Sequence, residues 1–284
     1  MALSLYLITF VKFFERMLRF ISFGSGSSGN CYMLYTDTDA LLIDAGVGVR
    51  TLKKQFKEYG LNWSMVKHII LTHDHADHVK SVGAMSKELC LPVYATKLVH
   101  HGIDTNYCVR HKLSPGFARY FEKNVPFQLG EFNVTPFHVP HDSTDCVGFS
   151  IDCQSTRFCI ITDAGHITDE MKSHISEANY LVIEANHDIE MLVHGPYPEH
   201  LKQRITGPTG HLSNTDCANT LAENITEKLR HVWLCHLSEE NNHPELARKT
   251  VEQILRSYGI IAGKDFGLEV LKRKTPSEIY TMAE

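Results

Sequence analysis

The stretch Thr72-His73-Asp74-His75-Ala76-Asp77-His78 is the most informative part of this 284-residue chain. It holds three imidazoles and two carboxylates, and it directly follows the apolar run at residues 68–71. His73 and His75 alternate, so both can turn toward one ion, while Asp77 and His78 lie one step further on and can reach a second. Imidazole nitrogen and carboxylate oxygen suit zinc, manganese or iron, and the stretch contains no thiolate that would make a softer site. The stretch therefore predicts a metal site at the end of a buried strand. A polar capping loop is the alternative interpretation.

The overall charge excludes one class of partner. Hydrophobic residues make up 43% of the chain, enough for a sizeable core, and the formal net charge is -5 with a pI of about 6.4. A non-specific nucleic-acid binder normally carries a strong positive field, which this chain lacks. A nucleic-acid substrate would need local basic residues, and the candidates are Arg50, Lys53, Lys54, Lys202 and Arg204. Those charges are equally consistent with solvated helix faces.

The cysteines predict a reducing compartment, which we take to be the cytoplasm. All eight are scattered, with no Cys-x-x-Cys pair, and several lie in apolar runs. Free, mostly buried thiols are therefore expected. The apolar start of residues 1–16 is too short for a membrane span and lacks the features of a secretory signal. We interpret residues 1–16 as an upstream extension or a weak amphipathic anchor, and residues 17–284 as a single domain.

Strands and helices alternate along the chain. Strands are expected at residues 19–23, 31–35, 40–43, 68–71, 132–137, 147–152, 158–162, 180–184 and 231–235. Helices are expected at about 49–59, 79–89, 214–223, with Asn214 as a candidate cap, and 244–258. This interleaving favours an α/β protein with layered sheets flanked by helices.

Several of these strands end abruptly in a residue that can bind metal. The strand at 40–43 leads to Asp44, that at 132–137 to His141, that at 158–162 to Asp163, and that at 231–235 to His236. His138 is the rival of His141, which we prefer because it stands directly before Asp142. The adjacent pair His100 and His101, and also His111, are expected at the surface.

This ordered set of residues resembles the metallo-β-lactamase superfamily. Its pattern is an Asp after an early strand, then His-x-His-x-Asp-His, then a lone His, a lone Asp and a final His. The resemblance implies a four-layer αββα sandwich with two divalent metal ions (zinc or manganese, or else iron). His73, His75 and His141 would then hold one ion and Asp77, His78 and His236 the other, with Asp163 bridging. Asp44 and Asp74 are expected to orient the ligands.

Three features favour a phosphodiester among the substrates that such a site can cleave. Asp77 is a hard oxygen ligand that leaves a metal ion acidic toward a phosphoryl oxygen. The loop at residues 25–30 could bind a phosphate through Ser25, Ser27, Ser28 and Asn30, although a flexible hairpin turn explains its composition equally well. In ribonuclease Z-like relatives a Glu and a His protonate the leaving oxygen, and Glu184 and His211 resemble that pair. They could also be unrelated polar residues at element ends. Glu184, His211 and Asp77 are thus the expected catalytic residues.

The motifs at residues 25–30, 184–188, 210–214 and 236–242 together resemble the WalJ (YycJ) group of cytoplasmic metallo-hydrolases. The resemblance implies a 5′-to-3′ exonuclease on double-stranded DNA, acting by attack of a metal-bridging hydroxide on phosphorus. The 73 residues from Asp163 to His236 leave no room for the inserted domain of ribonuclease J-like enzymes. One alternative is a hydrolase of small esters or thioesters, and a less favoured one is a non-catalytic regulatory protein with structural metals. Protein partners are not predicted.

Overall fold

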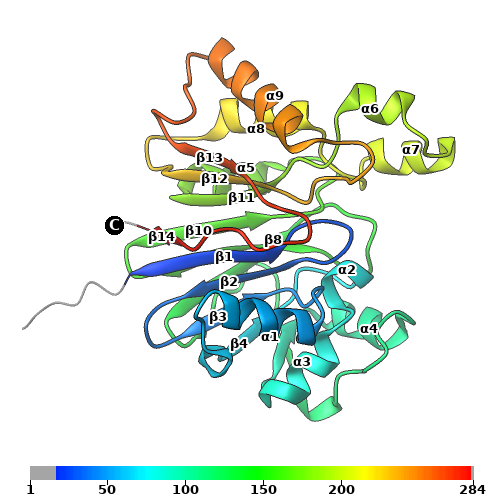
Figure 1. Cartoon of the computed structure of the whole chain (residues 1–284), viewed down its shortest axis with the longest axis vertical. Helices are drawn as coiled ribbons and strands as arrows, with labels where there is room; N and C mark the ends of the chain where they lie inside the picture. Colours follow the sequence, from blue (N-terminus) through cyan, green and yellow to red (C-terminus); the bar gives the residue numbers. More distant parts are fainter. Residues whose placement is uncertain (1–16, 283–284) are drawn as a thin grey trace, which may run out of the picture.

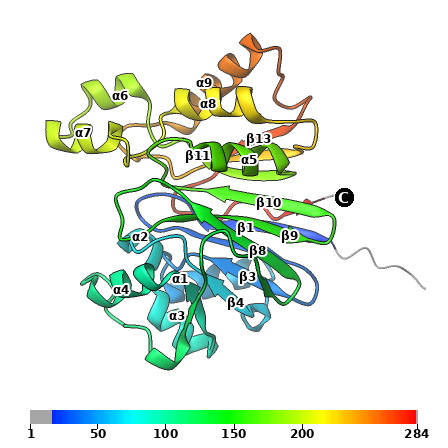
Figure 2. The same ribbon diagram turned by 180° about the vertical axis from the view of Figure 1, so that it is seen from behind.

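Two mixed β-sheets lie face to face, and helices cover the outer face of each sheet (Figures 1 and 2). The structure is a computed structural model that describes residues 17–282, so our expectation for residues 1–16 lies outside the described part. The four layers confirm the αββα sandwich expected from the sequence.

The first sheet has the strand order β14-β1-β2-β3-β4-β5-β6. Its strands are β1 (Leu18–Gly24), β2 (Cys31–Tyr35), β3 (Ala40–Ile43), β4 (His68–Ile70), β5 (Val93–Ala95), β6 (Ala118–Tyr120) and β14 (Tyr280–Met282). The helices on its outer side are α1 (Val49–Glu58), α2 (Ala76–Val79), α3 (Val82–Leu89) and α4 (Lys97–Thr105), with short 3-10 turns η1 (Trp63–Met65) and η2 (Pro115–Phe117).

The second sheet has the order β13-β12-β11-β10-β9-β8-β7. Its strands are β7 (Phe127–Leu129), β8 (Phe132–His138), β9 (Val147–Cys153), β10 (Thr156–Ile161), β11 (Tyr180–Glu184), β12 (His231–Cys235) and β13 (Gly267–Val270). The helices α5 (Asp169–Glu177), α8 (Asn214–Asn224) and α9 (Pro244–Ser257) cover it, and α6 (Ile189–His194) and α7 (Glu199–Thr206) project beside them (Figure 2).

Aromatic side chains from both sheets fill the central layer. Phe20 of β1 lies with its ring centroid 4.6 Å from that of Trp233 and 5.3 Å from that of Phe158, both on the opposite sheet. All three are essentially inaccessible to solvent. Strands buried on both faces need continuous apolar runs, which explains why the sequence shows such runs rather than alternation.

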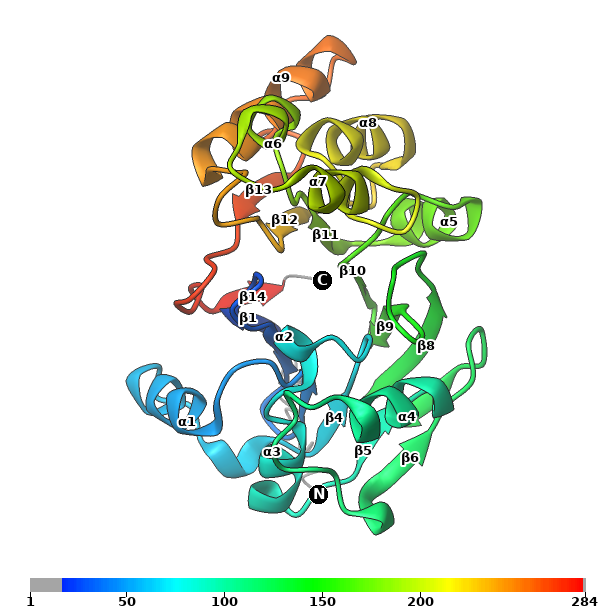
Figure 3. The ribbon, with the colours of Figure 1, turned by 90° about the vertical axis from the view of Figure 1, so that its right-hand side faces the viewer.

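The strand ends of both sheets meet at one edge of the molecule. β3 pairs in parallel with β4, and β10, β11 and β12 are mutually parallel, so their carboxyl ends point the same way within each sheet. In the view of Figure 3, α2 lies below and α7 above the place where these ends come together. This edge is where an open α/β sheet normally carries its functional residues.

Two expected helix features are wrong in detail. The helix expected at 79–89 is broken into α2 and α3, because the Ser81 N–H donates to the carbonyl of Ala45 at 3.0 Å and leaves the helical ladder. The cap of α8 is Ser213 rather than Asn214, in a capping box with Asp216.

All eight cysteines are free, as expected, and six of them are buried. Among residues 17–282, no helix has the length and apolar character needed to cross a membrane.

Candidate metal centre and active site

The histidine-rich stretch is fixed to the neighbouring strand by one carboxylate. Asp44, fully buried after β3, accepts hydrogen bonds at Oδ1 from the N–H of Thr72 at 2.8 Å and from its hydroxyl at 3.0 Å. Its Oδ2 lies 2.7 Å from Nδ1 of His78. A carboxylate can only accept, so Nδ1 of His78 carries a proton, and Nε2 is the nitrogen that can bind metal once its own proton is displaced. Asp44 thus orients a residue that can bind metal.

Three strand ends adopt the left-handed backbone conformation. Asp44 after β3, Asp163 after β10 and His236 after β12 have φ of 65°, 54° and 53°. Residues other than glycine rarely adopt this region, and each instance costs about 1–3 kcal/mol. Such strain persists only where surrounding contacts fix it, and it gathers at functional sites.

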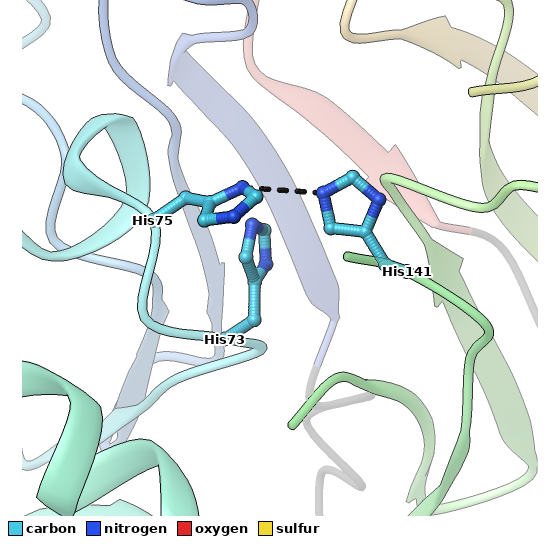
Figure 4. Close-up of side chains that lie close together, drawn as sticks. All are labelled: His73, His75 and His141. Atoms are coloured by element: carbon cyan, nitrogen blue, oxygen red, sulfur yellow. Dashed lines mark hydrogen bonds between the residues drawn. The ribbon is translucent and has the colours of Figure 1, made fainter. Parts of the chain in front are cut away.

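One group of side chains consists of three imidazoles (Figure 4). His73 and His75 come from the stretch after β4, and His141 follows β8 across the interface between the sheets. Nε2 of His141 lies 3.2 Å from Nδ1 of His75, and the ring centroids of His73 and His141 are 5.1 Å apart. Nδ1 of His141 donates to the carbonyl of Gly210 at 3.0 Å, which leaves Nε2 as the free acceptor.

A second group lies beside the first and is formed by Asp77, His78 and His236. Oδ2 of Asp77 is 3.2 Å from Nε2 of His236 and 3.6 Å from Nε2 of His78. Asp163 lies between the groups, because its Oδ2 is 3.2 Å from Nε2 of His78 and its Oδ1 is 3.8 Å from Nε2 of His141. One carboxylate can therefore reach both groups.

These residues fit divalent cations. Nε2 of His73 is buried without a hydrogen-bond partner, an expensive state for a ring nitrogen unless something binds there. Burial alone would raise the pKa of the Asp163 carboxyl, yet the charges of His236 and His78 hold that pKa well below its usual range. Burial likewise opposes a charge on His78, but Asp163, Asp44 and Asp77 raise its pKa to about 10. A cation that binds here must displace protons, so binding should tighten as the pH rises.

Glu184 meets His211, as the sequence led us to expect, but it also meets a second imidazole. It is fully buried at the end of β11, and its Oε1 lies 2.8 Å from Nδ1 of His211 and 3.0 Å from Nδ1 of His236. Oε2 accepts the backbone N–H groups of Ala164 and Leu212 at 2.9 and 3.1 Å. Burial by itself lowers the pKa of His211, and the Glu184 charge raises it above the ordinary value. Glu184 therefore orients both rings.

The loop at residues 25–30 divides into buried and exposed members. Asn30 is buried, and its Nδ2 donates to Oδ2 of Asp77 at 3.2 Å and lies 2.8 Å from Nε2 of His78. Oγ of the buried Ser25 accepts the N–H of His236 at 2.9 Å. Only Ser27 and Ser28 are exposed. The side chains of Ser25 and Asn30 thus hold the ligand-bearing segments, and of the four proposed substrate contacts only Ser27 and Ser28 face solvent.

Asp74 turns away from the imidazoles. Its carboxylate accepts the N–H and the hydroxyl of Thr144 at 3.0 and 2.6 Å, so it anchors the loop that carries His141. His138 lies apart from the site, exposed and beside Lys123.

The surface position expected for His100 is wrong. The side chain is buried in α4, where a ring nitrogen donates to the carbonyl of Arg119 at 2.9 Å. Its ring also packs edge-on against Tyr120, with the centroids 5.2 Å apart. His101 and His111 are exposed, as expected.

An ion pair at the rim of the site has no signature in the sequence. The guanidinium of Arg204 in α7 donates hydrogen bonds to both carboxylate oxygens of Asp142, one of them at 2.9 Å. Oδ1 of Asp142 lies 3.7 Å from Nε2 of His75 and 3.6 Å from Nε2 of His141. The pair joins residues 62 positions apart, so no local pattern could have revealed it. It places a cation, half-exposed, next to the first imidazole group.

Comparisons with known proteins agree with this geometry. Residues 40–236 match the model of the beta-lactamase superfamily domain. The chain is 36% identical over 265 residues to exodeoxyribonuclease YycJ of Bacillus anthracis, covering 92% of this chain and 98% of that protein. It is 31% identical over 242 residues to exodeoxyribonuclease WalJ of Streptococcus pneumoniae, covering 85% and 90%.

Among solved structures, the metallo-beta-lactamase fold protein YhfI of Bacillus subtilis superposes with a TM-score of 0.67 at 16% identity, covering 93% of this chain and all of that one. This likeness concerns the fold alone. The family match and the near full-length relatives go further: the chain belongs to the metallo-β-lactamase superfamily of metal-dependent hydrolases, and within it to the group of YycJ and WalJ.

Proposed function

We propose that this chain is a phosphodiesterase with two divalent metal ions, and that it degrades double-stranded DNA from the 5′ end. The names of its relatives YycJ and WalJ, both exodeoxyribonucleases, support a DNA substrate. The observation that carries the proposal is the position of Asp163, whose carboxylate reaches both imidazole groups while the pair of Glu184 and His211 lies beside it. Eight unpaired cysteines support a reducing compartment, and we propose the cytoplasm.

The ligand assignment follows from the two groups. His73, His75 and His141 would hold one ion, and Asp77, His78 and His236 the other, with Asp163 between them. When bound, two divalent cations supply Lewis acidity, lower the pKa of water and offset charge on the phosphoryl oxygens. Imidazole and carboxylate ligands accept zinc, manganese and iron alike, so elemental analysis of protein purified without added metal is the test of identity.

The chain itself supplies the proton that the leaving group needs. Nδ1 of His211 donates to Glu184, so Nε2 can give its proton to the oxygen that leaves phosphorus. Burial lowers the pKa of His211, but the Glu184 charge raises it above the ordinary value and so favours the proton on the ring. When the bond from phosphorus to this oxygen breaks, the oxygen takes the proton and the ring becomes neutral. The attacking water provides the new oxygen on phosphorus and releases a proton to solvent, from which the ring is protonated again.

The deciding experiment incubates the protein with duplex DNA labelled at either the 5′ or the 3′ end, with single-stranded DNA and with RNA, with and without manganese. We expect mononucleotides to appear first from the labelled 5′ end of duplex DNA. Loss from the 3′ end, or internal cuts, would contradict the polarity. If DNA is untouched while small esters or thioesters are cleaved, the alternative hydrolase activity is correct.

Variants tie the activity to the site. Asp77→Ala and His75→Ala should reduce cleavage to background while the fold persists. His138→Ala is the matched control, since it also removes an imidazole but lies outside the two groups. An equal loss in the control would show that the assay reports something other than the proposed centre.

A further inference from the structure

A small cavity lies beside the candidate centre, at the same edge of the molecule. Its volume is about 280 Å³, and the residues that define it here are Ser28, Gly46, Gly48, Thr51, Lys80 and Arg273, joined by Lys274. Gly46 and Gly48 follow β3, Lys80 follows α2, and Arg273 follows β13, so these segments leave strand or helix ends on the side that carries the ligands. Below about 300 Å³, a pocket suits a compact group rather than a drug-sized molecule.

The wall of this cavity is positively charged. Nζ of Lys80 donates to the carbonyl of Ser28 at 2.5 Å, and the guanidinium of Arg273 donates to the carbonyls of Leu237, Ser238 and Asn242 at 2.9, 2.5 and 2.8 Å. Within residues 17–282, neither Lys80 nor Arg273 forms an ion pair with a carboxylate. Lys274 pairs with Glu239 at 2.6 Å, and both of these side chains are more than half exposed. Lys80 therefore brings to the cavity a charge without a carboxylate partner among the described residues, while the guanidinium of Arg273 is held by three carbonyls and lies within the field of Glu239.

The backbone at the cavity is closely packed at Gly46 and open at Gly48. A Cβ on Gly46 would lie 1.6 Å from the carbonyl oxygen of Asp77, so this position must stay bare. A Cβ on Gly48 would meet only Oγ1 of Thr51, at 4.0 Å, so the space beyond it is open. The first turn of α1, which starts at this wall, contains no acidic residue and no capping side chain that would compete with an anion.

The cavity and the centre share a thin partition. The N–H of Asn30 donates to the carbonyl of Asp77 at 2.7 Å, and the N–H of Gly46 donates to the carbonyl of Asn30 at 2.8 Å. Lys80 lies three residues after Asp77, a rise of about 4.5 Å in an ideal helix. The same short segments therefore border both places, so a strand bound at the centre can bring a nearby phosphate to the cavity.

We propose that this cavity binds a phosphate group of the nucleic-acid strand whose neighbouring phosphodiester lies at the metal centre. The inference rests on the proposed function and identifies a part of the substrate that binds outside the metal centre. The phosphate is either the 5′-terminal group or an internal one, and both present the same anionic oxygens to Lys80 and Arg273.

The test uses one variant that removes a cation from the cavity, one that adds an anion to it, and one control. Lys80→Ala removes a cation from the wall. Thr51→Glu adds an anion at the cavity, and because an acid in the first turn of a helix is favourable, weaker binding cannot be ascribed to a weakened α1. Lys57→Gln removes a charge from the last turn of the same helix, at an exposed side chain that does not line the cavity.

Two measurements are made on duplexes that carry either a 5′-phosphate or a 5′-hydroxyl. The first is kcat and KM for cleavage, and the second is binding by fluorescence anisotropy over a salt series in a His75→Ala background. Both cavity variants should raise KM and Kd about 10-fold with kcat within about twofold, and Lys80→Ala should lower the slope of log K against log salt by about one. Lys57→Gln should stay close to wild type.

The outcomes separate the possibilities. A loss confined to the 5′-phosphorylated duplex assigns the terminal phosphate, and an equal loss on both duplexes assigns an internal one. If the wild type degrades DNA while both cavity variants behave as the Lys57→Gln control does, the inference is overturned and the proposed function stands. If the wild type does not degrade DNA, the proposed function fails, and the anisotropy of Lys80→Ala against its background alone decides whether the cavity binds phosphate.

Discussion

The substitution Glu184→Gln should weaken one of the two proposed metal sites and spare the other. It keeps the size of the side chain and replaces one carboxylate oxygen by an NH₂ group. The carboxylate now accepts four hydrogen bonds, two from the backbone N–H groups of Ala164 and Leu212 and two from Nδ1 of His211 and His236. Glutamine has only one oxygen, so one side of the network must change.

The side that can change is the imidazole side. Backbone N–H groups cannot give up their protons, and an NH₂ group facing them would leave buried donors unsatisfied at about 1–3 kcal/mol each. The imidazoles can instead accept at Nδ1 and move their protons to Nε2. Nε2 of His236 would then donate to Oδ2 of Asp77, 3.2 Å away, and its lone pair would no longer be available to a metal ion.

The magnitude follows from this tautomer change. Loss of a partner that orients a metal-binding imidazole typically costs 10- to 100-fold in metal affinity, which corresponds to about 1.4–2.8 kcal/mol. The site of Asp77, His78 and His236 should weaken by this factor. The site of His73, His75 and His141 should change less than about threefold, because Nδ1 of His141 donates to the carbonyl of Gly210 and not to Glu184.

The assay is metal content per chain, measured by mass spectrometry after equilibration in buffers of fixed free zinc or manganese. Two classes of site are expected in the wild type, and one class should move in Glu184→Gln. Glu177→Gln, at an exposed glutamate that pairs with Lys228, is the control. Equal weakening of both sites, or no change in either, would refute the reasoning from tautomers.

Three further predictions concern other parts of the molecule. Arg204→Ala removes a rim cation and should raise KM for DNA severalfold at unchanged metal content; metal loss would instead mean that Asp142 needs its partner to keep the site intact. Burial lowers the pKa of His231 to about 4 from its ordinary 6.5, so the protein should lose about 1–3 kcal/mol of stability as the pH falls from 6.5 toward 4. In His231→Phe the midpoint of chemical denaturation should depend less on pH over that range. An unchanged dependence on pH would contradict this assignment. In the native protein an alkylating reagent should label the exposed Cys90 first and Cys108 more slowly, and mass spectrometry of the peptides measures both rates. Rapid labelling at any other cysteine would show that the packing is looser than described.

The sequence sufficed to predict the fold class and the order of the candidate ligands. The reason is physical: strands buried on both faces leave uninterrupted apolar runs, and a His or Asp placed directly after such a run stands out. The strand ranges 31–35, 40–43, 180–184 and 231–235 were predicted to the residue for the same reason. The family resemblance then arranged the ligands in two groups.

What the sequence could not show depends on contacts between distant segments. Ser25 and Asn30 belong to a loop whose composition predicts solvent exposure, yet both are buried because the loop folds over Asp77 and His236. The left-handed backbone at Asp163 and His236 is imposed by the tertiary structure, since neither residue favours it enough to be read locally. His236, the second imidazole that Glu184 contacts, lies 52 positions further along the chain, so no local pattern reveals that contact.

The two sheets divide the ligand set between them. The first half of the chain, up to β6, carries His73, His75, Asp77 and His78, and the second half, from β7 onward, carries His141, Asp163 and His236. Neither half holds a complete group, so two co-expressed fragments cut between β6 and β7 could assemble a working centre only after their aromatic faces, Phe20 on one and Trp233 on the other, had docked. Turnover by such a split protein would report the reunion of the halves directly.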